Sequence, residues 1–126
     1  MYRQNPYTKI KENAINTATP EDLTLMLYDG ALKFANRAAI AIEKKNYTDA
    51  NMYIQKTKDI IREFQITLNM DYEISTQLYE AYEYMHYRLT QANIKKDLEI
   101  LNEVIDHIRL FRDTWKEAMK IARASR

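Results

Sequence analysis

The sequence is poor in the residues that cross-link a chain or turn it sharply. It has no cysteine, one glycine and two prolines in 126 residues. Without cysteine the protein forms neither disulfide bonds nor thiolate metal sites. A β-rich fold needs many tight turns, and glycine and proline supply most of them. Their scarcity therefore favours long helices joined by short connectors.

A strong charge of one sign and long apolar runs are also missing. The 19 basic and 18 acidic side chains leave a net charge of +1, whereas a nucleic-acid-binding protein normally gathers a basic surplus. No run reaches the roughly 18 apolar residues of a membrane-spanning helix, and residues 1–16 lack the apolar core of a signal peptide. We therefore expect a cytoplasmic protein with no nucleic-acid partner and no membrane insertion.

The apolar spacing and one strong helix start predict the fold. Thr19 can cap a helix that begins at Pro20, with acidic residues in its first turn. From this start the spacing predicts four helices, at about 20–44, 48–68, 72–92 and 97–123, after a leader of residues 1–18. Short connectors make neighbouring helices antiparallel. The prediction is an all-α, antiparallel up-down-up-down four-helix bundle with a short N-terminal cap segment.

Three breaks separate the predicted helices. We expect Thr48 and Asp49 to cap the second helix. The turn before the third helix is placed at 69–71, because asparagine and aspartate favour turn conformations. We expect the segment from Asn93 to Lys96 to end the third helix.

The sequence carries no convincing catalytic or metal-binding motif. A di-metal bundle needs two Glu-x-x-His motifs, and Glu83 with His86 forms one of them. The second is absent, because the residue three positions before His107, the other histidine, is Val104 and not glutamate. There is no cysteine nucleophile and no glycine-rich phosphate loop. We expect no enzyme activity, no catalytic residue, no metal and no cofactor. A phosphorelay bundle using His86 or His107 is a less favoured alternative.

The first predicted helix is apolar over more of its circumference than a bundle core requires. One stripe contains Leu23 and Leu27, and a second contains Leu25, Tyr28 and Leu32. A helix on the surface of a bundle normally buries a single apolar stripe. We therefore expect the second stripe to be covered by the leader, by a second subunit or by a helix of a partner protein.

Tyrosine is abundant, with ten residues, and five of them fall in the third predicted helix. The bundle core accounts for Tyr82. Tyrosine is favoured at protein interfaces because it is large, rigid and amphipathic. We interpret Tyr79, Tyr84 and Tyr87 as part of a helical surface that binds a partner protein. The alternative is that they are half-buried residues at the rim of the bundle core.

The leader also has apolar residues at helical spacing, among them Tyr7 and Ile10. It is too short to form a stable helix alone. We expect a lid that lies over the apolar groove until a partner displaces it, with a frayed terminus as the alternative. Within the bundle, we expect Gly30 to mark a close helix crossing and Trp115 to lie in the core between the fourth and first helices.

Six segments carry a family resemblance that covers almost the whole chain. They are Asn5-Pro6-Tyr7, Thr17 to Leu23, Leu27 to Leu32, Met70 to Glu73, Ala92-Asn93 and Arg112 to Trp115. In this order they resemble the flagellar secretion chaperone FliS family. One departure is Ile10, where many members of that family carry a second tyrosine.

The resemblance implies a four-helix bundle that binds the C-terminal region of flagellin in the cytoplasm. Such a chaperone prevents premature polymerisation and keeps flagellin competent for flagellar type III export. The resemblance also implies contacts with the flagellar export gate and with flagellar regulatory proteins. The protein is expected to be a monomer or weak homodimer; a helical homo-oligomer with a structural or adaptor role is the alternative. The expected partner-binding residues are Tyr7, Ile10, Leu25, Tyr28, Leu32, Tyr79, Tyr84 and Tyr87.

Overall fold

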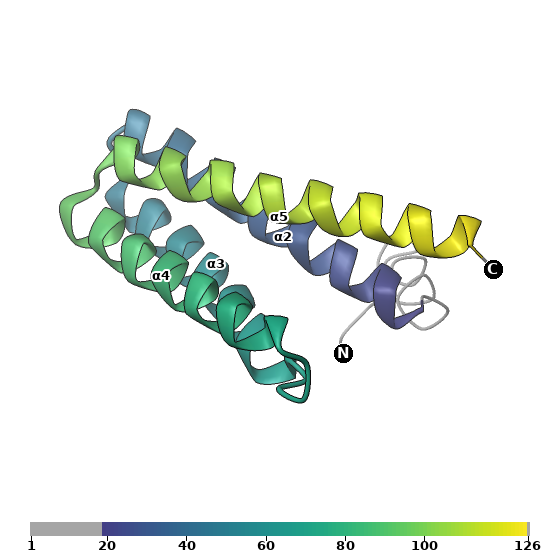
Figure 1. Ribbon diagram of the computed structural model, residues 1–126. Coiled ribbons are helices and arrows are strands. Elements are labelled where there is room, and N and C mark those ends of the chain that lie inside the picture. The colour runs from purple at the N-terminus through teal and green to yellow at the C-terminus, as the bar shows by residue number, and fades with distance from the viewer. Residues whose placement is uncertain (1–18, 126) are drawn as a thin grey trace, which may run out of the picture.

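The computed structural model describes residues 19–125, which form four α-helices (Figure 1). They are α2 (Pro20–Glu43), α3 (Tyr47–Thr67), α4 (Ile74–Lys95) and α5 (Leu98–Ala124). Helix α2 packs beside α3 and α5, and α4 packs beside the same two helices. The predicted antiparallel bundle is confirmed. The leader of residues 1–18 lies outside the described residues. Within the described part, no helix is long and apolar enough to cross a membrane.

The start of α2 follows the prediction, whereas the start of α3 does not. Thr19 Oγ1 accepts a hydrogen bond from the Asp22 backbone N–H at 3.1 Å. The cap of α3 is Asn46 and not Thr48. The Asn46 side chain accepts from the Asp49 N–H at 3.2 Å and donates to the Asp49 carboxylate at 2.8 Å. Asparagine is favoured as a cap because its side-chain oxygen accepts a hydrogen bond from a free backbone N–H of the first turn; its amide group can donate a second bond.

Helix α4 continues past the predicted break at Asn93. The Asn93 side chain is buried and donates a hydrogen bond to Asn51 Oδ1 on α3 at 2.7 Å, so it stays inside the helix. The helix ends at Lys95. The capping residue Lys96 has a left-handed backbone (φ 49°) and donates through Nζ to the Asn93 carbonyl at 2.6 Å. The predicted turn at 69–71 is present, because Asn69 Oδ1 accepts from the Asp71 N–H at 3.0 Å.

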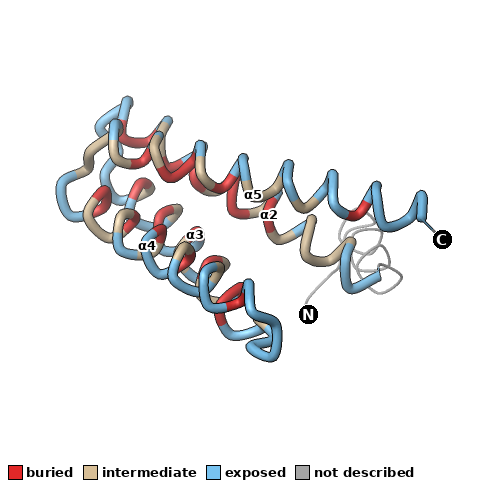
Figure 2. The backbone as a smooth tube through the Cα atoms, in the orientation of Figure 1, coloured by how far each residue is buried: buried red, intermediate tan, exposed pale blue. Residues whose placement is uncertain are grey.

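The core lies between the four helices and is fullest toward the α2–α3 connector (Figure 2). Three fully buried alanines on α2 leave room for the large side chains of its neighbours. These alanines are Ala31, Ala35 and Ala38, and they face a core that includes Ile54, Ile61, Leu89, Leu101 and Ile108. Gly30 was expected to mark a close helix crossing. It faces Ile60 of α3, but a Cβ atom there would lie 3.6 Å from Ile60 Cδ1, an ordinary contact distance, so the packing does not require a glycine.

At the opposite end the bundle splits. Helices α2 and α5 stay side by side toward the α2 N-terminus, while α3 and α4 diverge from them as a second pair (Figure 1). The buried positions of α5 fall between Leu101 and Ile108, and Met119 is the one buried residue in its later turns (Figure 2). The C-terminal half of α5 is thus packed on one side and open on the other.

Candidate partner-binding surface

An apolar groove opens where α4 diverges from α5. We call it the split-end groove; its volume is about 220 Å³ and it is lined by Tyr28, Leu78, Leu110, Phe111 and Thr114. Leu110 is 60% exposed although it is a large aliphatic side chain. An apolar hollow beside an exposed leucine is typical of a site that receives an apolar side chain.

The groove ends on a stack of aromatic rings. Phe64 of α3 stacks on Tyr28 at a centroid distance of 4.4 Å and on Tyr82 at 5.3 Å. Phe111 meets Tyr82 edge to face at 5.7 Å. Burial raises the pKa of Tyr28 and of Tyr82 above the usual value of 10, so both phenols stay neutral. The groove therefore has an uncharged, well-packed wall.

An exposed strip on α5 continues from the groove toward the C-terminus. Leu110, Thr114, Ala118 and Ile121 follow one another at spacings of four and three, which places them on one side of the helix. A hollow of about 470 Å³ lies along the last three, with Asp113 and Glu117 at its edge, and Ile121 is 59% exposed. We call these four residues the α5 strip. A helical partner could lay its apolar face along such a strip.

Polar contacts hold the C-terminal half of α5 against α2. Arg123 pairs with Asp22 at 3.0 Å, and Arg112 pairs with Asp29 at 3.5 Å. The side-chain hydrogen bond of Thr19, and after it that of Arg123, lowers the pKa of Asp22. Trp115 donates its Nε1–H to the Glu21 carbonyl at 3.2 Å. Trp115 thus meets the first bundle helix as expected, but it is half-buried and packs at the edge of the core.

The structure places two of the three expected binding residues of α2 in the interior. Tyr28 and Leu32 are each 5% exposed, because α2 packs against both α3 and α5 and its two apolar stripes are covered there. Leu25 is half-buried beside a hollow between α2 and α5. The expectation of an uncovered second stripe on α2 is therefore wrong at Tyr28 and Leu32. Tyr7 and Ile10 lie outside the described residues.

The three exposed tyrosines of α4 have different hydrogen-bond partners. The Tyr79 carbonyl accepts from Gln65 of α3 at 3.2 Å, so this residue lies near α3. Tyr84 donates to Glu103 of α5 at 2.8 Å. The Tyr87 hydroxyl accepts from Gln91 of its own helix at 3.0 Å. Tyr84 and Tyr87 are three residues apart and so share one side of α4. The roles of all three tyrosines in partner binding stay predictions.

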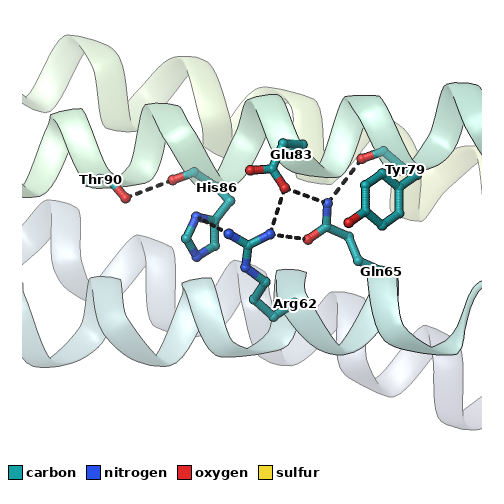
Figure 3. A network of polar contacts seen from close by, with 6 residues as sticks. All are labelled: Arg62, Gln65, Tyr79, Glu83, His86 and Thr90. Carbon is teal, nitrogen blue, oxygen red and sulfur yellow. Dashed lines mark hydrogen bonds and ion pairs between the residues drawn. The ribbon is translucent and has the colours of Figure 1, made fainter.

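His86 belongs to a polar network between α3 and α4 (Figure 3). Arg62 donates to Glu83 at 2.6 Å and to Gln65 Oε1 at 2.6 Å, and its other terminal nitrogen lies 3.3 Å from His86 Nδ1. Burial, and after it the Arg62 charge, lowers the pKa of His86. Hydrogen bonds from Gln65 and Arg62 lower the pKa of Glu83. Both members of the Glu-x-x-His half-motif thus contact a guanidinium. In residues 19–125 no three ligating side chains gather into a metal site.

The four residues of the α5 strip were not predicted from the sequence as a binding surface. The sequence did contain a signal for this strip, because Leu110 and Ile121 are apolar residues of the longest helix that do not belong to its buried side. The divergence of α3 and α4 from α2 and α5 is what uncovers the strip.

The chain is similar in sequence to known flagellar proteins. The family model described as "Flagellar protein FliS" matches residues 3–122. The chain is 47% identical over 123 residues to the flagellar secretion chaperone FliS of Bacillus subtilis (strain 168), an alignment that covers 98% of this chain and 92% of that protein. It is 31% identical over 111 residues to the FliS of Escherichia coli (strain K12), covering 86% and 82%.

A crystal structure described as that of a flagellar chaperone from bacteria shares the fold. Its TM-score is 0.75 at 14% identity, over 91% of this chain and 98% of the other. The four-helix arrangement is therefore one that a solved protein adopts. With the family model matching from residue 3 to residue 122, the chain belongs to the FliS family of flagellar secretion chaperones.

Proposed function

We propose that this protein is a non-enzymatic export chaperone that binds the C-terminal region of flagellin in the cytoplasm. By covering that region it prevents premature polymerisation and keeps flagellin competent for flagellar type III secretion. Membership of the FliS family supports this function. The single structural observation that carries it is the α5 strip, an exposed apolar surface that continues into the split-end groove.

The shape of this surface suits a helical segment. An amphipathic helix presents apolar residues at spacings of three and four, which match the spacing of the strip. A segment that folds on binding loses about 2–5 kcal/mol of its contact energy to ordering, so it needs a long contact. The strip runs from Leu110 to Ile121, and the groove extends the contact toward α4.

The proposal is tested by placing charge on the strip. Leu110→Glu and Ile121→Glu should each weaken binding of the flagellin C-terminal segment by about tenfold or more, because a carboxylate would be desolvated in the contact. Both side chains are exposed, so the bundle should remain folded. Isothermal titration calorimetry measures the affinity, and circular dichroism checks the fold.

Ile94 provides a matched control. It is 78% exposed but lies near the C-terminal end of α4, away from the split end. Ile94→Glu should leave the affinity unchanged. If the three variants bind the segment equally well, flagellin docks elsewhere and the assignment to the α5 strip is wrong.

Other partner assignments rest on the family alone. We also propose contacts with the export gate and with flagellar regulatory proteins, but we assign no surface of the bundle to them. The competing function is a helical homo-oligomer that joins through the α5 strip. Sedimentation with and without the flagellin segment distinguishes the two, because a dimer that persists unchanged when the segment is added supports the structural role.

A further inference from the structure

A second surface lies on the outer side of α2 and α3. We call it the basic ridge; it comprises Lys33 and Arg37 of α2, Lys44 directly after α2, Lys56 of α3, and the aromatic residues Phe34 and Tyr53 between them. Lys33 and Arg37 are four residues apart and share one side of the helix, and Lys44 lines the same hollow as Arg37. The ridge reaches the α2–α3 connector, at the opposite end of the bundle from the split-end groove (Figure 1).

The aromatic rings support the cations of the ridge. The Phe34 and Tyr53 rings stack at a centroid distance of 6.3 Å. Lys33 Nζ lies 5.7 Å from the Phe34 ring, and Lys56 Nζ lies 5.2 Å from the same ring. Arg37 Cζ lies 5.9 Å from the Tyr53 ring. These cation–π contacts position the charges without neutralising them.

Arg37 differs from the other arginines of residues 19–125. Each of the others forms an ion pair with a carboxylate: Arg62, Arg88, Arg109, Arg112 and Arg123. Within that range Arg37 has no carboxylate within ion-pair distance, and neither have Lys33, Lys44 and Lys56. A guanidinium that is already packed on a ring loses less freedom when its N–H groups bind a carboxylate.

A hollow of about 270 Å³ lies beside Arg37. Arg37 and Lys44 line it together with Ile40 and Tyr53, and Ile40 is an exposed aliphatic side chain. Asp49 also lines the hollow and keeps its negative charge; its carboxylate is held in the first turn of α3 by a hydrogen bond from the Asn46 side chain, and the two cations outnumber it. The hollow therefore offers an apolar wall next to two cations, which is complementary to an aliphatic side chain beside a carboxylate.

We propose that the basic ridge binds an acidic peptide segment of a partner protein. In this complex a glutamate or aspartate pairs with Arg37, and a neighbouring aliphatic side chain enters the hollow. Duplex nucleic acid fits less well, because the ridge has only four cations, has the aliphatic Ile40 beside it and has Glu63 two turns after Lys56. The assignment goes beyond flagellin binding and does not rest on it, since the ridge and the α5 strip share no residue.

The test uses the full chain and a synthetic peptide of about 16 residues made of glutamate, leucine and alanine. A matched peptide with glutamine in place of glutamate is the control ligand. Amide chemical shifts in ¹⁵N-labelled protein should change around Arg37 and Tyr53 with the glutamate peptide and not with the glutamine peptide. Added salt should weaken this binding.

Arg37→Gln should weaken binding of the glutamate peptide by about tenfold, since it removes a charge-assisted hydrogen-bond donor. Arg109→Gln is the matched control, because Arg109 is an exposed arginine of α5 paired with Asp106; its effect should be less than about twofold. Equal losses in both variants would overturn the proposal, as would shifts that map to the α5 strip.

Two further outcomes would also overturn it. Tighter binding of a duplex DNA of about 20 base pairs than of the glutamate peptide would assign the ridge to nucleic acid. Displacement of the glutamate peptide by the flagellin C-terminal segment would show that the ridge is no separate site. Simultaneous binding of the two ligands supports the proposal.

Discussion

Tyr28 of α2 and Tyr82 of α4 bring their phenol oxygens to 2.6 Å across the centre of the bundle. These two helices are diagonal to each other, since α2 and α4 each pack beside α3 and α5. Both rings also stack on Phe64. The pair lies where the closed core gives way to the split-end groove, so it links the two helix pairs at the point where they begin to diverge.

The hydrogen bond between these two hydroxyls predicts how the free energy of unfolding changes in single and double variants. Tyr82→Phe should lower the free energy of unfolding by about 1–3 kcal/mol, because the buried Tyr28 hydroxyl loses its partner. Tyr28→Phe should have a similar effect. The double variant should lose less than the sum of the two, since no unpaired hydroxyl remains. Urea denaturation of the four proteins measures the cycle; strictly additive losses would mean that the two hydroxyls do not stabilise each other.

Gly30 is predicted to be a site where stability can be gained. Gly30→Ala should raise the free energy of unfolding by about 0.5–1 kcal/mol, because alanine restricts the unfolded chain and the added Cβ would meet Ile60 Cδ1 at an ordinary 3.6 Å. Ala39→Gly, on the same helix, should give a loss of similar size. Thermal unfolding measures both. A destabilised Gly30→Ala variant would show that Ile60 cannot accept the extra methyl group.

The network around His86 predicts a pH dependence of stability. Burial, Arg62 and Lys58 lower the pKa of His86 below its usual 6.5, and they outweigh Glu83 and Asp59, which raise it. Between the folded-state pKa and 6.5 the unfolded chain binds more protons than the folded protein. The stability contributed by neutral His86 is therefore complete above pH 6.5 and decreases as the pH falls below that value.

The measurement is urea denaturation at several pH values between about 7 and 5. His86→Gln keeps a polar side chain near Arg62 but does not titrate, so its stability should change less with pH in this range. An identical pH slope in the two proteins would contradict the role of His86.

The leader gives the last prediction, which rests on its sequence pattern. Removing residues 1–10 should tighten binding of the flagellin C-terminal segment or promote self-association, because Tyr7 and Ile10 would no longer compete for the apolar surface. Calorimetry and sedimentation of the shortened chain measure the two effects. A Tyr7→Ser, Ile10→Ser variant is the control, since it keeps the chain length and should act in the same direction. Unchanged affinity and unchanged oligomeric state would rule out a lid.

The sequence by itself determined the fold class and most helix positions. One glycine and two prolines, the Thr19-Pro20 start and the regular apolar spacing predict four antiparallel helices without any long-range information. These signals are local, because capping and helical periodicity act within a few residues. The cap at Asn46 and the extension of α4 through Asn93 were missed. The second of these depends on Asn51, which lies on another helix.

The tertiary structure alone decided which apolar surfaces are covered. Tyr28 and Leu32 were expected on an uncovered apolar stripe, yet the neighbouring helices bury them, and Tyr28 only contributes to the wall of the split-end groove. Leu110 and Ile121 carried no assignment, yet the divergence of the two helix pairs leaves them exposed. Periodicity shows which side of a helix is apolar, but whether that side is buried depends on how closely the other helices approach it, and this is set by packing between residues far apart in the chain.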